Sequence, residues 1–408
     1  MNIYKNTRIK VLMLGWEYPP FISGGLGTAC KGIIDGLAAT GGVDVTLTLP
    51  KAYPRASKLV FPRIVSFSPL AQFNKLYDSS YNYRIHLVVE DYAGKVERFA
   101  RTESFDVIHA HDWLTGVAGR RIKYLTGTPL VLHIHSTELD RGGSGGDLVV
   151  WGLEKLAMDA ADVIVAVSHY TKNLICRRYH QDPKKIQVIH NAVSKLEDPV
   201  LKRKRGGLIT FAGRVTSQKG PEYFVRAAQL TLRRQPALKF VLAGEGDQLD
   251  SMKKLSHYLG ISSNFFFPGF LQSEDLHQLL CRSQLAVLPS LSEPFGILAL
   301  EAVQAGVPVV ISKSFGAAEV LPSLDQTHYW DTQAISELML KVSCDSDYAA
   351  RKICLAQQEL SSVSWESSAE RLIGIYRDLV FQSEFATVRL LGRSKSVPNC
   401  EVKTPMSD

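Results

Sequence analysis

The stretch LAVLPSLSEPFGILALE (residues 285–301) contains an apolar run, a polar loop and the beginning of a helical pattern, in that order. The run 285–288 has the length and the uninterrupted apolar character of a strand that is buried on both faces of a parallel sheet. A helix is expected to start at Gly296, where the loop ends. Strand, loop and helix in this order form the repeating unit of parallel α/β proteins, so the stretch predicts that fold class.

The same unit repeats on both sides of this stretch. In the second half of the chain we expect strands at 208–212, 240–243, 261–267 and 307–311 and a helix at 221–234. In the first half we expect strands at 8–14, 43–49, 85–89, 106–109, 129–134 and 163–167, with helices at 26–39, 114–124 and 148–160. Strands that alternate with helices indicate βαβ units, so the sequence predicts two doubly wound, Rossmann-like parallel sheets.

A polar, charged segment that ends in Gly-Gly separates the two halves. We therefore expect a linker between two domains, followed by a C-terminal helix that packs back towards the first domain and by a disordered polar tail. The expected parts are an N-terminal domain (1–193), the linker (194–207), a C-terminal domain (208–364), the helix (365–385) and the tail (386–408). In both domains, ligands should bind beyond the carboxyl ends of the strands.

Composition excludes several classes of protein. The 408 residues are 45% hydrophobic and 21% charged, as in ordinary globular proteins. The apolar run 9–14 is too short to span a membrane, and none of the six cysteines forms a Cys-x-x-Cys pair, so we expect a cytoplasmic protein without disulfides or a zinc ribbon. Nucleic-acid binding is not expected, because no aromatic residues accompany the basic clusters.

The net charge of +7 raises the question of what the basic clusters contact. The clusters lie at residues 177–178, 184–185, 202–205 and 233–234. Solvated helix faces are one interpretation, and peripheral contact with the inner face of a membrane is the other, because opposite surface potentials attract.

Two motifs that follow predicted strands are suited to binding an anion. The loop SGGLG (residues 23–27) lies at a helix start, where glycines let backbone N–H groups approach a phosphate; a plain tight turn is the alternative. The loop GRVTSQKG (residues 213–220) carries two cations, Arg214 and Lys219. Such a pair can stabilise charge on a leaving diphosphate without a metal, and a charged surface loop is the alternative.

Two further loops, HAHDW (109–113) and HIHST (133–137), are rich in histidine. Their imidazoles can contact the hydroxyls of a sugar, or they can bind a metal, since His-x-His places two rings on one strand face. For His109 and His133, hydrogen-bonded core residues are the default interpretation. Because neither a cysteine nor a clear set of carboxylates accompanies the histidines, we expect no metal site.

The opening stretch carries two glutamates that can reach one ligand. Glu293 lies in the loop and Glu301 lies further along the helix that follows it. One carboxylate can accept hydrogen bonds from sugar hydroxyls and the other from ribose hydroxyls. For Glu301, an ordinary position on a helix surface is the alternative.

In this order, the GGL loop, HAHDW, HIHS, GRVTSQKG and EPFG-x-x-x-LE resemble the group 1 retaining glycosyltransferases, over roughly residues 8–380. The segments GWEYPPFISGGLGTAC and HIHSTELDR are most similar to a prokaryotic, glycogen-synthase-like subgroup. The resemblance implies the GT-B fold, in which two Rossmann-like domains face a cleft. It also implies transfer of a hexosyl unit, glucosyl in the glycogen and starch synthases, from a nucleotide-diphosphate sugar to a saccharide acceptor, with no metal or other cofactor.

The resemblance assigns roles to individual residues. His135 matches the histidine that contacts the transferred sugar, and Arg214 and Lys219 match the pair that holds the donor phosphates. Glu293 matches the glutamate near the sugar 3-hydroxyl, and Glu301 matches the glutamate on the ribose. The other positions that match donor-binding ones are Gly24, Gly25, Leu26, Gly213, Phe270, Leu271, Phe295, Gly296, Ile297 and Leu298.

Some positions concern the acceptor side or depart from the family pattern. Asp112 falls where synthase-like members have an acidic residue near the acceptor. Ile22 and Ser23 stand where bacterial synthases of the ADP-glucose type carry a lysine, so the resemblance implies no particular donor base. The segment 314–316 replaces a Gly-Gly pair that many members have.

Other functions fit the same residues. For a glycosyltransferase, the expected acceptor is either a soluble α-glucan or an envelope saccharide of the lipopolysaccharide type at the membrane surface. A GT-B nucleotide-sugar epimerase would need no acceptor, and a non-catalytic binding module would only bind the donor. A metal hydrolase built on the histidine loops would lose its activity to a chelator.

Overall fold

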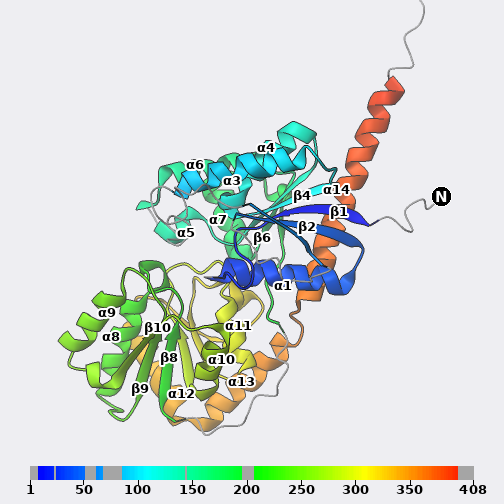
Figure 1. Ribbon diagram of the computed structural model, residues 1–408. Coiled ribbons are helices and arrows are strands. Elements are labelled where there is room, and N and C mark those ends of the chain that lie inside the picture. The colour runs from blue at the N-terminus through cyan, green and yellow to red at the C-terminus, as the bar shows by residue number, and fades with distance from the viewer. Residues whose placement is uncertain are drawn as a thin grey trace, which may run out of the picture.

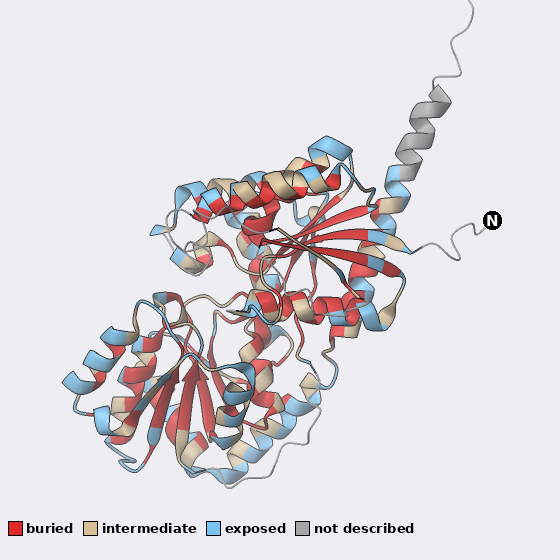
Figure 2. Cartoon of the chain, in the orientation of Figure 1, coloured by how far each residue is buried: buried red, intermediate tan, exposed pale blue. Residues whose placement is uncertain are grey.

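The computed structural model describes residues 8–22, 24–50, 61–67, 85–142, 145–194 and 206–393, with side chains as far as residue 383. Within these residues the chain forms two α/β domains, each built on a parallel sheet with helices on both faces (Figure 1). Buried residues are concentrated in the strands and on the helix faces that cover them (Figure 2). The expected fold class of two doubly wound sheets is confirmed.

The N-terminal domain contains a seven-stranded sheet with the order β3-β2-β1-β4-β5-β6-β7. Its strands are β1 (Ile9–Leu14), β2 (Val43–Leu49), β3 (Arg63–Ser66), β4 (Val107–His111), β5 (Leu130–Ile134), β6 (Val163–Ala166) and β7 (Ile186–Val188). Its helices are α1 (Gly25–Thr40), α3 (Ile85–Ala100), α4 (Asp112–Thr126), α5 (Glu138–Gly142), α6 (Leu148–Ala160) and α7 (His169–Tyr179), with a 3₁₀ turn η3 (Pro183–Lys185).

The C-terminal domain contains a six-stranded sheet with the order β10-β9-β8-β11-β12-β13. Its strands are β8 (Leu208–Ala212), β9 (Lys239–Ala243), β10 (Phe265–Gly269), β11 (Leu285–Leu288), β12 (Val309–Ser312) and β13 (Asp325–Thr327). Its helices are α8 (Pro221–Leu232), α9 (Leu249–Tyr258), α10 (Ser273–Arg282), α11 (Ile297–Gln304), α12 (Thr332–Cys344) and α13 (Ser346–Leu360), with 3₁₀ turns η4 (Ser217–Lys219), η5 (Ser262–Asn264) and η6 (Gly316–Glu319).

The last helix, α14 (Trp365–Arg393), leaves the second domain and packs along α1 of the first. The approach is close because two glycines of α1 face Trp365: a Cβ on Gly32 would lie 2.0 Å from the indole ring, and one on Gly36 would lie 2.3 Å from the Trp365 carbonyl oxygen. One cluster of buried apolar side chains runs through both domains and includes Ile33 of α1, Val303 of α11 and Trp365. The domains therefore share part of their core.

Three predictions of secondary structure differ from the structure. Residues 85–89, predicted as a strand, form the start of α3; buried Val88, Tyr92 and Val96 show that the apolar run is one face of an amphipathic helix. The strand predicted at 261–267 begins only at Phe265, after η5. Helix α14 continues to residue 393, so 386–393 are helical rather than a tail.

Some predictions concern parts of the chain that lie outside the described residues. These are most of the linker, at 195–205, and the end of the tail, at 394–408. Among the described helices we find none with the length and hydropathy needed to cross a membrane.

Candidate active site

Loops at the carboxyl ends of strands from both sheets meet between the domains. Ser168, after β6, donates a hydrogen bond from Oγ to the carbonyl oxygen of Pro294 at 2.6 Å. Ser292, in the loop after β11, donates from Oγ to Asp140 Oδ1 at 2.5 Å, and Tyr170 OH lies 2.9 Å from the same Oγ. Helix α5 of the first domain also contacts η4 of the second. The loop with the EPFG motif is thus bonded to the opposite domain.

Lys219 Nζ and Glu293 Oε2 form an ion pair. The pair joins the two loops that the sequence predicts to bind the donor. Both side chains are largely buried, with 19% and 13% of their surface exposed, so the pair is poorly screened by solvent. Their loops can meet because residue 220 is glycine: it has a φ of 68°, and a Cβ there would lie 2.1 Å from the carbonyl oxygen of Pro289. A side chain at Gly220 would separate the two loops.

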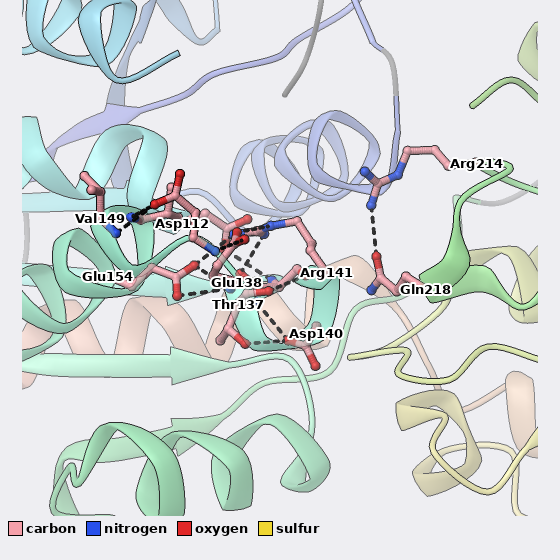
Figure 3. A network of polar contacts seen from close by, with 12 residues as sticks. Asp112, Thr137, Glu138, Asp140, Arg141, Val149, Glu154, Arg214 and Gln218 are labelled. Carbon is pink, nitrogen blue, oxygen red and sulfur yellow. Dashed lines mark hydrogen bonds and ion pairs between the residues drawn. The ribbon is translucent and has the colours of Figure 1, made fainter. Parts of the chain in front are cut away.

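Gln218 connects these loops and was not anticipated from the sequence. Its side chain is buried, donates from Nε2 to the carbonyl oxygen of Ser292 at 3.0 Å, and accepts from Arg214 Nη2 at 3.3 Å (Figure 3). Its own carbonyl oxygen accepts from the N–H of Leu291 at 2.8 Å. Arg214, Lys219 and Glu293 are therefore held on one rigid surface.

Helix α11 begins beside this surface. Gly296 has a φ of 94°, and a Cβ there would lie 2.1 Å from the ring of Phe315. Phe315 belongs to the segment that departs from the family pattern, and this segment is bonded to the motif: the N–H of Glu293 donates to the carbonyl oxygen of Ser314, and that of Gly316 donates to the carbonyl oxygen of Glu293, both at 2.9 Å. The first N–H groups of α11, which no helical carbonyl accepts, are thereby positioned beside the ion pair.

Glu301 lies on α11 and is only partly exposed. Burial raises the pKa of its carboxyl group to about 7, since a charge is costly away from water. The group is therefore poised between its neutral and ionised forms near neutral pH.

On the first domain, the predicted histidine loops bring four imidazoles together. His109 Nε2 lies 3.3 Å from His133 Nδ1, and His111 Nδ1 lies 2.9 Å from His135 Nε2. The two pairs stack on each other, with 4.6 Å between the ring centres of His109 and His111 and 4.3 Å between those of His133 and His135. Burial lowers the pKa of all four rings, that of His111 to about 3, so they are neutral at pH 7.

Asp112 supports His135. Its Oδ1 accepts hydrogen bonds from the N–H groups of His135, at 2.6 Å, and of Ser136, at 3.3 Å. Burial raises the pKa of Asp112 to about 6, and its φ of 53° is unusual for a residue other than glycine. These contacts hold the HIHS loop, and the contact with the acceptor implied by the resemblance stays a prediction.

A buried network behind this loop was also not anticipated (Figure 3). Glu154 of α6 accepts from the N–H of Glu138 at 2.8 Å and from Arg141 Nη2 at 2.9 Å, and it is bonded to Tyr179 OH. Asp140 Oδ2 accepts from both the N–H and the hydroxyl of Thr137 at 2.8 Å. The network fixes α5 and therefore Asp140, which accepts the hydrogen bond from Ser292 of the second domain.

The remaining predicted positions lie around the same region with fewer contacts. Gly24 and Gly25 begin α1, and a Cβ on either would meet no atom within 4 Å. Phe270 and Leu271 follow β10; Phe270 is 47% exposed. Ser23 lies outside the described residues.

Comparison with known proteins agrees with this architecture. Residues 193–352 match the family described as glycosyl transferases group 1, and residues 23–195 match glycosyltransferase family 4. An alpha-maltose-1-phosphate synthase of Mycolicibacterium smegmatis is 30% identical over 67% of this chain and 79% of its own length. A glycogen synthase of Mycobacterium tuberculosis is 28% identical over 90% of this chain and 94% of its own.

A solved structure with the same fold is the sucrose-phosphate synthase from Thermosynechococcus elongatus, with a TM-score of 0.76 and 19% identity over 91% of this chain and 99% of that one. The fold, the two family matches and the positions of the motif residues at the ends of both sheets all indicate the same family. The chain belongs to the group 1 glycosyltransferases of the GT-B fold.

Proposed function

We propose that the protein transfers a hexosyl unit, glucosyl in the first instance, from a nucleotide-diphosphate sugar to a saccharide acceptor, with retention at the anomeric carbon and without a metal. The observation that carries this proposal is the surface formed by Arg214, Lys219 and Glu293 beside the first turn of α11. Two cations and a helix N-terminus on one surface suit a leaving diphosphate.

In this proposal the donor binds beside the ion pair of Lys219 and Glu293, which stays in place. The diphosphate binds Arg214 and Lys219, and the sugar hydroxyls bind the carboxylate of Glu293 that Lys219 holds in place. The backbone N–H groups of Ile297 and Leu298 complete the phosphate contacts. Gly24 and Gly25 give the backbone of the opposite domain close access to the diphosphate, because no side chain stands between.

The proposed reaction proceeds on one face of the sugar. The bond from the anomeric carbon to the diphosphate oxygen breaks, and the acceptor hydroxyl forms the new bond on the same face. The hydroxyl loses its proton to the departing phosphate oxygen. His135 orients the sugar as a neutral hydrogen-bonding partner, and closure of the domains excludes water. No covalent sugar–enzyme intermediate is involved.

A soluble α-glucan is the acceptor we favour, with an envelope saccharide at the membrane surface as the alternative. The contacts of one basic cluster support this choice. Lys185 Nζ donates to the carbonyl oxygens of Met158, at 2.6 Å, and Asp159, at 3.0 Å, so it caps α6. A lysine in this position is less available to an anionic surface than the sequence suggests.

Donor turnover tests the proposal. We expect purified protein in EDTA, without acceptor, to release nucleotide slowly from one of UDP-glucose, ADP-glucose, UDP-N-acetylglucosamine and GDP-mannose. Addition of glycogen should accelerate release, and NMR of the product should show an α-anomer. Binding of none of these donors in calorimetry would contradict the proposed site, and donor isomerisation without an acceptor would identify an epimerase.

The pH dependence of donor affinity tests the role of Glu301. Ribose hydroxyls donate to the ionised carboxylate, and with a pKa near 7 only about a tenth of the groups are ionised at pH 6. We therefore expect the affinity for the nucleotide, measured by calorimetry, to rise about tenfold from pH 6 to pH 8. Glu301→Gln should remove this slope, and Glu293→Gln should keep it. An equal slope in Glu301→Gln would assign the titration to another group.

A further inference from the structure

The four-histidine cluster contains more unpartnered nitrogens than a buried site ordinarily has. His111 Nε2, His133 Nε2 and His135 Nδ1 are all buried without a hydrogen-bond partner. Buried polar atoms in native proteins are nearly always paired, and exceptions frequently mark an ion or a function. Three exceptions in one group of touching rings indicate that the cluster has a binding partner of its own.

The spacing of the donor atoms fits a metal ion. One nitrogen from each of His109, His111 and His133 lies within 4.8 Å of the other two. The 3.3 Å between His109 Nε2 and His133 Nδ1 equals the separation of two ligands around tetrahedral zinc, about 3.3 Å for Zn–N bonds of about 2.0–2.1 Å.

The structure assigns His109, His111 and His133 as a binding site for a divalent transition-metal ion, Zn²⁺ in the first instance. The choice of ion follows from the ligands, because the group of donors among the described residues contains only imidazoles. Neutral imidazole suits zinc and its neighbours, whereas Mg²⁺ and Ca²⁺ require oxygen ligands.

Neighbouring residues complete the site. The hydroxyl of Tyr376, on α14, is bonded to His109 Nδ1 at 2.5 Å, which leaves Nε2 of that ring directed towards His133. A partner of this kind on the far nitrogen is what metal-bound histidines usually have. His135 lies beside this group, with its Nε2 2.9 Å from His111 Nδ1. Because the proposed reaction assigns no role to His109, His111 or His133, the site does not rest on the proposed function.

Metal content of the full chain, prepared without a polyhistidine tag, tests the assignment. We expect protein treated with EDTA and then incubated with Zn²⁺ to retain one zinc per chain after gel filtration, measured by mass spectrometry. Co²⁺ should give the visible absorption of a tetrahedral nitrogen site. Failure to retain Zn²⁺, or a Co²⁺ spectrum of octahedral ions, would overturn the assignment.

Variants locate the ion. His111→Asn should weaken zinc binding by more than about tenfold, while His86→Gln and His257→Gln, on exposed helix surfaces, should leave it unchanged. Tyr376→Phe keeps the ring in the core and removes only the hydroxyl, so it should fold normally and lower the affinity by about 10–100-fold. If His111→Asn does not fold, the zinc affinity of Tyr376→Phe alone tests the site. Unchanged zinc affinity in Tyr376→Phe together with full zinc content in His111→Asn would contradict the site.

Discussion

Lys219→Ala is expected to lower the rate of glycosyl transfer by about 10²–10³-fold, the usual loss when one fixed donor to a developing oxyanion is removed. Lys219 is largely buried beside Glu293 and lies on the same surface as Arg214. Charge develops on the diphosphate as the bond to the sugar breaks, so the ammonium group stabilises the transition state more than the bound donor. The loss should therefore appear mainly in kcat rather than in KM.

Two controls separate this effect from a general disturbance. Lys253→Ala removes a lysine from an exposed ion pair with Asp250 in the same domain, so the rate should not change. The double variant Lys219→Ala/Glu293→Gln removes the unpaired carboxylate that the single variant leaves behind. If its rate returned to near that of Glu293→Gln alone, the effect of Lys219 would be structural support of Glu293 and not stabilisation of the leaving group.

The sequence predicted the fold well where a single apolar pattern ran from one end of an element to the other. The strand 285–288 and the helix 148–160 have the predicted bounds, since each contains one type of periodicity and ends at a polar or small residue. The error at 85–89 has a physical reason. The five residues 85–89 are too few to distinguish a strand from the start of an amphipathic helix. The helical spacing of the apolar residues, one turn every 3.6 residues, becomes visible only when the pattern is followed as far as Val96.

For the site, the sequence identified charged residues in loops but not the residues that hold them. Lys219 and Glu293 were recognisable because motifs carry them. Glu319 was not: its carboxylate accepts the N–H groups of His169 and Tyr170, both at 2.8 Å, and so caps α7 of the other domain. A cap normally lies next to its helix in the sequence, whereas this one is about 150 residues away, and no local pattern can reveal it.

Glu154 is a second residue of this kind, and its removal should have the largest effect on stability. Its carboxylate is 1% exposed and accepts from Arg141 Nη2, from the N–H of Glu138 and from Tyr179 OH. Glu154→Ala leaves these donors without their acceptor and opens a cavity, although Arg141 keeps its bond to Glu138 at 3.2 Å. We expect the free energy of unfolding to fall by about 3–5 kcal/mol, as when one partner of a buried ion pair is removed.

The matched control is the next residue of the same helix. Lys155 pairs with Asp159 on the solvent side of α6, so Lys155→Ala should cost no more than about 0.5 kcal/mol. Urea unfolding followed by tryptophan fluorescence suits the comparison, because Trp16, Trp113 and Trp151 report on the N-terminal domain. A difference of less than about 1 kcal/mol between Glu154→Ala and Lys155→Ala would show that the network does not carry the stability of the domain.

The dependence of this stability on pH has a sign that separates Glu154 from ordinary carboxylates. Burial raises its pKa from 4.5 to about 7, so between these values the folded protein binds more protons than the unfolded chain. The contribution of Glu154 to the free energy of unfolding is therefore fully present below pH 4.5 and is lost as the pH rises to about 7. Relative to Glu154→Gln, which does not titrate, the native protein should lose about 1 kcal/mol per pH unit from pH 5.5 to 7. A difference that stays constant, or that grows in favour of the native protein, would mean that Arg141 and Tyr179 compensate the buried charge completely.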